Sequence, residues 1–149
     1  MWKGQLAAKT QCLYQLCRVL IEELLPQVDA RQMVIIDMSS HPEARSFMPV
    51  GSHYILLENA PNWLKGHVII HTDKLHKVDD VHTFLYQVSK RMFPEGLALV
   101  AWTRKDTNLA RGYMQAFNRR FSKVRLIHDG ACNAVCLVGP RVEVEALSA

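Results

Sequence analysis

Long apolar runs are absent from this 149-residue sequence, and glycine and proline are scarce. No stretch reaches the roughly 18 consecutive apolar residues of a membrane-spanning helix, and the first residues lack the pattern of a signal peptide. With 49% hydrophobic residues, seven glycines and six prolines, the composition excludes collagen-like and disordered chains. We therefore expect a folded protein without membrane insertion, and by default a cytoplasmic one.

Cysteines are few, and no two of them form a CxxC pair. Cys12 and Cys17 fall within a predicted helix, whereas Cys132 and Cys136 lie on or beside a predicted strand. This distribution favours buried free thiols in a reducing compartment. A metal-binding or redox role for the thiols is the alternative.

Motifs for several common chemistries are also missing. The sequence contains no Walker A loop, no GxGxxG fingerprint and no GxSxG elbow, which argues against nucleotide hydrolysis, dinucleotide chemistry and α/β-hydrolase activity. His71, Asp73 and His76 are close in sequence, but their spacing matches no closed zinc site and supplies no fourth ligand. We predict no metal site and assign no catalytic residue.

Short apolar runs alternate with amphipathic segments along the chain. Runs that are apolar on both faces are typical of central strands in a parallel sheet. We expect strands at 33–38, 53–58, 67–71, 97–102, 124–128 and 134–138. We expect helices within 1–26, at 81–92 and at 107–121. The connection between the last two strands is five residues long, which forces them to pair antiparallel.

This order of elements predicts an α/β fold. We expect a single domain over 1–149, built as a three-layer α/β/α sandwich around a mostly parallel, mixed sheet of about six strands. A helix within 1–26 precedes the sheet, a closing antiparallel pair ends it, and 141–149 form a tail. Ligands of such sheets bind beyond the carboxyl ends of the strands, where Asp37 and Glu58 lie.

Positive charge is concentrated in residues 104–125, which hold seven basic residues and one acidic residue, a net charge of +6. A helical period places Arg111, Arg119 and Lys123 within about a third of the helix circumference. This segment could therefore bind phosphates or an acidic protein, and an ordinary solvated helix face is the alternative. The candidate contacts are Arg104, Lys105, Arg111, Arg119, Arg120 and Lys123.

Two parts of the sequence resemble class I S-adenosylmethionine-dependent methyltransferases. VIIHTDKLHKVDD, VHTFLYQVSKRM, FPEG and LALVAW are similar to the middle of that family, and FSKVRLIHDGACNAVCLVGPR is similar to its closing strands. The resemblance covers most of 10–140 and implies a Rossmann-like fold. It also implies that Asp37 and Glu58 occupy the positions of cofactor-binding acids, with Glu58 at the ribose-binding position. An Asx-type turn at Asp37 and an ordinary strand-end acid at Glu58 are the alternatives.

The sequence departs from that family at the cofactor site. In the family, the turn after the first strand reads as an acid followed by Gly-x-Gly, whereas this turn reads DMSSH from Asp37. Only residues 59–65 separate Glu58 from Gly66, so one strand–helix unit of the usual fold is expected to be missing.

From these departures we predict a non-catalytic methyltransferase-like domain, a pseudoenzyme without a cofactor, that serves as a protein-binding or assembly subunit of a larger complex. Its partner, or a second copy of the chain, would bind at the uncovered sheet edge or at the basic helix. A divergent S-adenosylmethionine-dependent methyltransferase is the first alternative. The second is a small nucleic-acid-binding module that uses residues 104–125.

Overall fold

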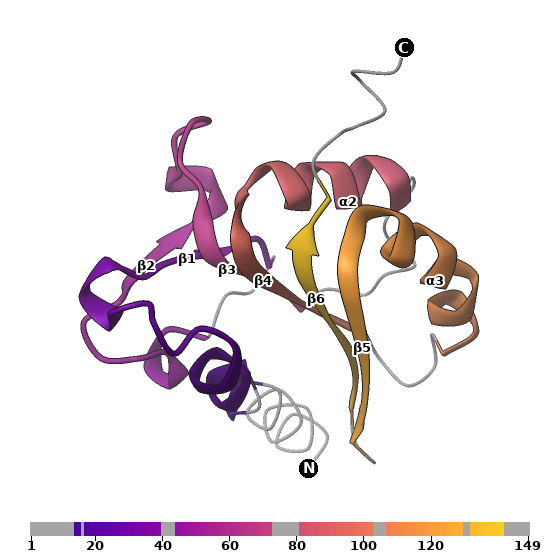
Figure 1. The fold of residues 1–149 in the computed structure, drawn as a ribbon, viewed down its shortest axis with the longest axis horizontal. Coiled ribbons are helices and arrows are strands. Elements are labelled where there is room, and N and C mark those ends of the chain that lie inside the picture. Colours follow the sequence, from indigo (N-terminus) through magenta and orange to yellow (C-terminus); the bar gives the residue numbers. More distant parts are fainter. Residues whose placement is uncertain are drawn as a thin grey trace.

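The computed structural model describes residues 14–15, 17–39, 44–72, 81–102, 107–129 and 132–141. Its sheet has six strands in the order β2-β1-β3-β4-β6-β5 (Figure 1). The strands are β1 Val34–Asp37, β2 His53–Leu56, β3 Gly66–His71, β4 Met92–Trp102, β5 Phe121–Asp129 and β6 Cys132–Pro140. The first four are parallel, while β6 pairs antiparallel with both β4 and β5. The predicted mixed sheet with its closing antiparallel pair is confirmed.

Helices cover both faces of this sheet. α2 (Val81–Lys90) and α3 (Thr107–Arg120) lie on one face, and the N-terminal helix, described through 17–24, lies on the other (Figure 1). The described connections contain the short 3-10 helices η1 Ala30–Gln32, η2 Arg45–Phe47 and η3 Leu57–Asn59. Within the described ranges, no helix is long and apolar enough to cross a membrane.

Two apolar cores lie on opposite faces of the sheet. Ile35 packs in the core beneath the N-terminal helix, and its neighbour Ile36 packs in the core beneath α2 and α3. Both side chains are fully buried because successive strand residues point to opposite faces. Cys17 and Cys136 are buried free thiols in the first core, as predicted, and burial raises the pKa of Cys136 to about 12.

The start of β4 differs from the prediction. A helix was expected at 81–92 and a strand at 97–102, but α2 ends at Lys90 and the strand already begins at Met92. The register shifts here, because Gly66 pairs with Met92 while Val68 pairs with Leu97. The β4 residues between these two pairs lie close to β3. A Cβ on Gly96 would lie 3.0 Å from the carbonyl oxygen of His67.

The connection from β2 to β3 is short, as the spacing predicted. It consists of η3 and residues 60–65, all of which are described, and it adds no strand or α-helix. Leu57 and Leu64 from this connection pack against the core beneath α2 and α3. Within the part of the chain that the structure describes, β2 forms one edge of the sheet and pairs with β1 alone.

Candidate functional site at the carboxyl edge of the sheet

Asp37 ends β1 at the edge of the sheet where ligands of α/β folds bind, and its side chain is buried, with 1% exposed. Its Oδ1 accepts a hydrogen bond from the backbone N–H of Ser39 at 2.9 Å. Its Oδ2 accepts a hydrogen bond from the hydroxyl of Tyr54. The Asx-type turn is therefore present, and both carboxylate oxygens of Asp37 are already engaged within the protein.

Tyr54 reaches Asp37 from the neighbouring strand β2. Burial and the hydrogen bond to the Asp37 carboxylate raise the pKa of Tyr54 well above its ordinary value. The hydroxyl therefore stays protonated and continues to donate. The guanidinium of Arg45 lies 5.2 Å from the centre of the Tyr54 ring and covers it. These contacts join the end of β1 to Tyr54 within β2 and to Arg45 of η2.

The turn after β1 is also tied to β3. The Oγ of Ser39 accepts hydrogen bonds from the backbone N–H and the hydroxyl of Thr72, both at 3.0 Å. One residue earlier, the N–H of Met38 donates to the carbonyl oxygen of Ile70 at 2.8 Å. Side-chain hydrogen bonds thus fix the part of this turn that the structure describes, at the position where the resembling family has glycine.

Glu58 lies at the same edge but in a different environment. It belongs to η3 and lies two residues after Leu56, the residue that pairs with Asp37 in the parallel register. Its side chain is exposed, whereas that of Asp37 is buried. The two predicted cofactor-binding acids are therefore at the expected edge, and Glu58 is the one whose carboxylate faces solvent.

The predicted histidine cluster is only partly described. His71 ends β3 with 8% of its surface exposed, and its ring centre lies 4.6 Å from that of Phe84. Asp73 and His76 lie outside the described residues. Among the residues that are described, no group of three or more His, Cys, Asp or Glu side chains could hold a metal ion.

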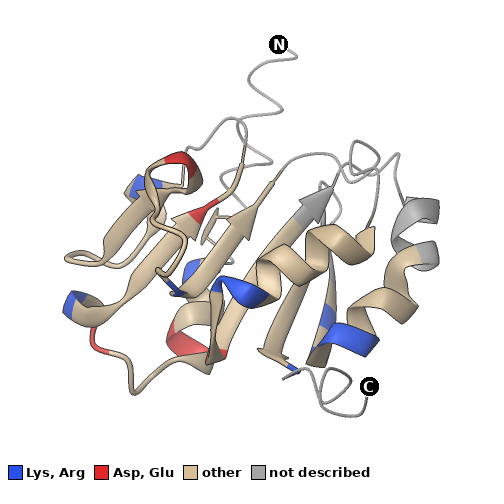
Figure 2. Cartoon of the chain, turned by 90° about the horizontal axis from the view of Figure 1, so that it is seen from above, with Lys and Arg blue, Asp and Glu red and all other residues tan. Residues whose placement is uncertain are grey.

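The basic segment is also covered only in part. Arg104 and Lys105 lie outside the described residues, and the side chain of Arg111 is not described. Arg119 is exposed, whereas Arg120 is partly buried, with its guanidinium 5.5 Å from the ring centre of Tyr86. Figure 2 shows basic residues at the C-terminal ends of both α2 and α3, along one edge of the sheet.

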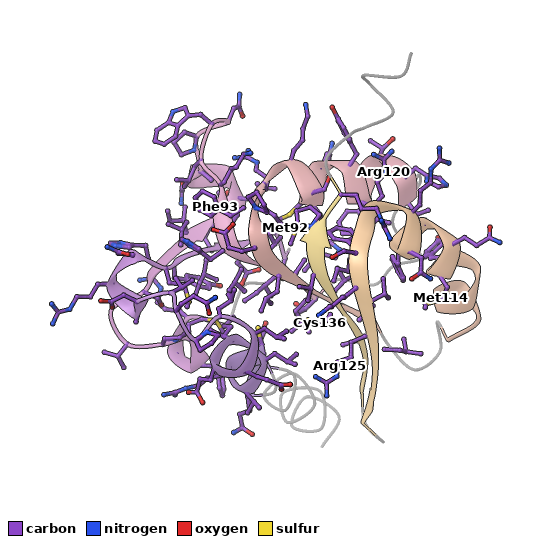
Figure 3. All side chains as sticks on the ribbon, in the orientation of Figure 1. Met92, Phe93, Met114, Arg120, Arg125 and Cys136 are labelled. Carbon is purple, nitrogen blue, oxygen red and sulfur yellow. The ribbon has the colours of Figure 1, made fainter. Side chains whose placement is uncertain are left out.

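The predicted place of Lys123 on the helix is wrong. α3 ends at Arg120, and the buried Phe121 begins β5, so Lys123 and Arg125 lie on a strand. Their register partners are Val138 and Cys136. Arg125 points toward the N-terminal helix (Figure 3), where its Nη1 lies 3.5 Å from the Glu23 carboxylate. The positive charge of this segment is therefore divided between elements.

Sequence reasoning placed residues 71–76 at the carboxyl edge without assigning a role to Thr72, and it missed Tyr54, whose hydroxyl reaches that edge from within β2. Each is a single polar residue beside an apolar run, a weak signal in one sequence. Their roles depend on which strands are neighbours, and that becomes known only with the sheet order β2-β1-β3.

This chain matches known proteins in structure and not in sequence. No family model and no curated protein matches the sequence. A proposed S-adenosylmethionine-dependent methyltransferase from Methanococcus maripaludis matches with a TM-score of 0.62 and 11% identity, covering 95% of this chain and 94% of its own. The T. thermophilus 16S rRNA methyltransferase RsmC, in complex with AdoMet and guanosine, matches with a TM-score of 0.57 and 12% identity. The match covers 83% of this chain and 42% of that protein. Human methyltransferase-like protein 13, in complex with SAH, matches with a TM-score of 0.55 and 11% identity. The match covers 92% of this chain and 83% of that protein.

The chain has a class I methyltransferase-like fold. At these identities the likeness establishes the fold and no activity. The prediction that the chain takes no cofactor is wrong on this comparison, because the matching structures are S-adenosylmethionine-dependent methyltransferases and some hold AdoMet or SAH.

Proposed function

We propose that this chain is a methyltransferase-like binding domain that holds S-adenosylmethionine or S-adenosylhomocysteine at the carboxyl edge of its sheet. The fold supports this proposal, and so does Glu58, an exposed carboxylate at the end of β2. A carboxylate can accept hydrogen bonds from both ribose hydroxyls of the cofactor. Bound S-adenosylmethionine would supply an electrophilic methyl group.

Asp37 does not fit a direct role in holding the cofactor. Its two oxygens already accept hydrogen bonds from Ser39 and Tyr54, and its side chain is buried. In this proposal Asp37 is a positioning residue that fixes the turn after β1. Glu58 alone of the two acids contacts the ligand.

Calorimetric titration with S-adenosylmethionine and S-adenosylhomocysteine tests the cofactor site. We expect saturable binding by the natural chain and a loss of at least about tenfold in affinity for Glu58→Ala, because the ribose hydroxyls lose a charged acceptor. Glu95→Ala is the matched control, since Glu95 is an exposed acid near the start of β4. Undetectable binding to both ligands would refute the cofactor proposal, and unchanged binding by Glu58→Ala would refute the role of Glu58.

We further propose that the domain works by binding and assembly rather than by methyl transfer. The hydrogen bonds of Asp37 and Ser39 in the described part of the turn after β1 support this role, and so does the place of β2 at the edge of the sheet. The N–H of His53 donates to the Met33 carbonyl, so the alternation of a parallel ladder directs the N–H groups of Tyr54 and Leu56 away from β1. An edge with outward-facing backbone donors is suited to pairing with a strand of another chain.

A proline at position 56 tests this edge. Leu56 has φ −75°, which proline adopts, so Leu56→Pro removes an outward N–H without breaking the β1–β2 ladder. If a second copy of the chain is the partner, light scattering should show concentration-dependent dimers for the natural chain and monomers for Leu56→Pro. Leu56→Ala is the control, because it loses the side chain but keeps the N–H and should still dimerise. Dimers that persist in Leu56→Pro would exclude β2 as the interface.

A further inference from the structure

A cavity of about 620 Å³ lies between the loop before β3 and the C-terminal end of α2. It is at the opposite edge of the sheet from Asp37, because Gly66, the first residue of β3, donates its N–H to the carbonyl oxygen of Arg91 at 2.6 Å. The cavity is open to solvent, since four of its five lining residues are exposed. The cavity is lined by Asn62, Lys65, Gln87, Lys90 and Arg91.

The lining of this cavity is strongly positive. Three of the five side chains are cationic, the other two are amides, and none is acidic. The Nη1 of Arg91 donates to the carbonyl oxygens of Pro61 at 2.6 Å and Leu64 at 3.4 Å. These acceptors are neutral, so they hold the guanidinium in place without cancelling its charge. A cavity with this lining favours an anion.

Offsetting a helix dipole explains only part of this charge. Basic residues in the last turn of a helix commonly stabilise its partly negative C-terminus, and Lys90 is in that position on α2. Lys65 belongs to the loop before β3, not to the helix, yet it lines the same cavity. Two separate segments therefore contribute positive charge to one space.

An exposed aromatic side chain belongs to the loop that supplies Asn62 and Lys65 to the cavity. Trp63 has 78% of its surface exposed and lies in the same loop, between Asn62 and Lys65. A single exposed ring needs no explanation by itself. A loop that supplies both an aromatic ring and a cation holds the two kinds of group that bind nucleotides. In such sites the ring stacks on a base while the cations contact phosphate.

We propose that this cavity binds the phosphate group of a nucleotide, with the base stacked on Trp63. The nucleotide could be free or part of a single strand, since the two share this chemistry. The site is distinct from the proposed cofactor edge, and S-adenosylmethionine carries no phosphate. Failure of either proposal therefore leaves the other standing.

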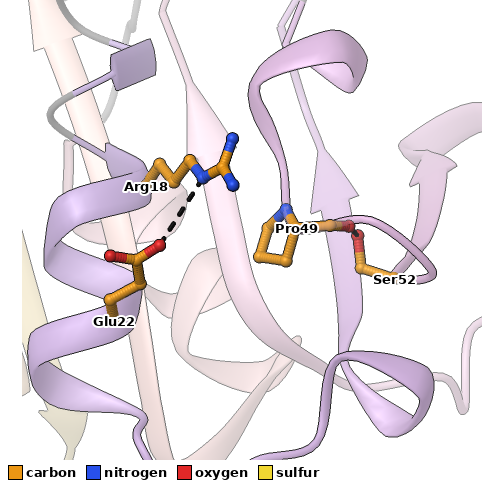
Figure 4. A network of polar contacts seen from close by, with 4 residues as sticks. All are labelled: Arg18, Glu22, Pro49 and Ser52. Carbon is orange, nitrogen blue, oxygen red and sulfur yellow. Dashed lines mark hydrogen bonds and ion pairs between the residues drawn. The ribbon is translucent and has the colours of Figure 1, made fainter.

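Binding of ATP and of a short fluorescein-labelled oligothymidine by the full chain tests this site. We expect saturable binding of at least one probe, and about a five- to tenfold loss of affinity in both Lys65→Gln and Lys90→Gln. Trp63→Ala should weaken binding to a similar extent, because stacking contributes comparably. Arg91 is kept, since it anchors the loop. Arg18→Gln is the charge-matched control, because Arg18 pairs with Glu22 at 3.6 Å on the N-terminal helix (Figure 4).

The two probes also separate the sources of the nucleotide. ATP that binds and displaces the strand supports a free nucleotide, whereas strand binding that ATP does not displace supports a single-stranded nucleic acid. The proposal is overturned if neither probe binds saturably at about 0.1 M salt, or if Arg18→Gln weakens binding as much as Lys65→Gln. Inorganic phosphate that competes as strongly as ATP would overturn the role of Trp63.

Discussion

Asp37→Ala is expected to lower the free energy of unfolding by about 2–4 kcal/mol, measured by urea denaturation. The Asp37 carboxylate accepts hydrogen bonds from the Ser39 N–H and the Tyr54 hydroxyl in a site where 1% of its surface is exposed. Alanine leaves both donors without their acceptor. Both donors are partly buried. A donor that loses its acceptor and is shielded from water costs its desolvation free energy, which exceeds the net gain of an ordinary hydrogen bond.

Two further variants control this expectation. Tyr54→Phe removes one donor and leaves the Ser39 hydrogen bond in place, so we expect a smaller loss of about 1–2 kcal/mol. Glu58→Ala changes an exposed side chain and should alter the free energy of unfolding by less than about 0.5 kcal/mol. Equal losses for Asp37→Ala and Glu58→Ala would contradict the separation of these two acids into a structural and a binding residue.

This separation shows where sequence reasoning stops at the carboxyl edge. An acidic residue at the end of an apolar strand is predicted to lie at the carboxyl edge of the sheet in an α/β fold, and both acids are found at that edge. The sequence does not show which acid is buried, because burial depends on what neighbouring strands bring. Tyr54 lies beside Ile35 in the register and covers Asp37, whereas nothing equivalent covers Glu58 among the described residues.

The strands of the sheet were predictable for a related reason. Runs such as Val68–Ile70 are apolar on both faces, and only a central strand between two layers buries both. The end of α3 was harder to place, because Phe121 continues the helical spacing of Tyr113 and Phe117. In the structure Phe121 begins β5 instead, so tertiary pairing with β6 overrides the local period.

Gly139→Ala is the second variant for which we expect a large loss, about 2–4 kcal/mol in the free energy of unfolding. Gly139 lies near the end of β6 with φ +66°, a conformation that costs any other residue free energy. A Cβ at this position would also collide with the hydroxyl of Ser122 on β5. That hydroxyl is held in place, because it donates to the carbonyl oxygen of Val138 at 3.0 Å.

Substitution of Gly51 measures the free-energy cost of positive φ without a steric collision. Gly51 also has positive φ, +89°, but a Cβ there would meet nothing nearer than the side chain of Arg31 at 3.9 Å. Gly51→Ala should therefore cost only the backbone part, about 1 kcal/mol. Adding Ser122→Ala to Gly139→Ala should recover the steric part, measured relative to Ser122→Ala alone so that the lost hydrogen bond cancels. Equal losses of unfolding free energy for Gly139→Ala and Gly51→Ala would contradict the steric part of this prediction. They would mean that the Ser122 side chain moves away from the added methyl group at little cost.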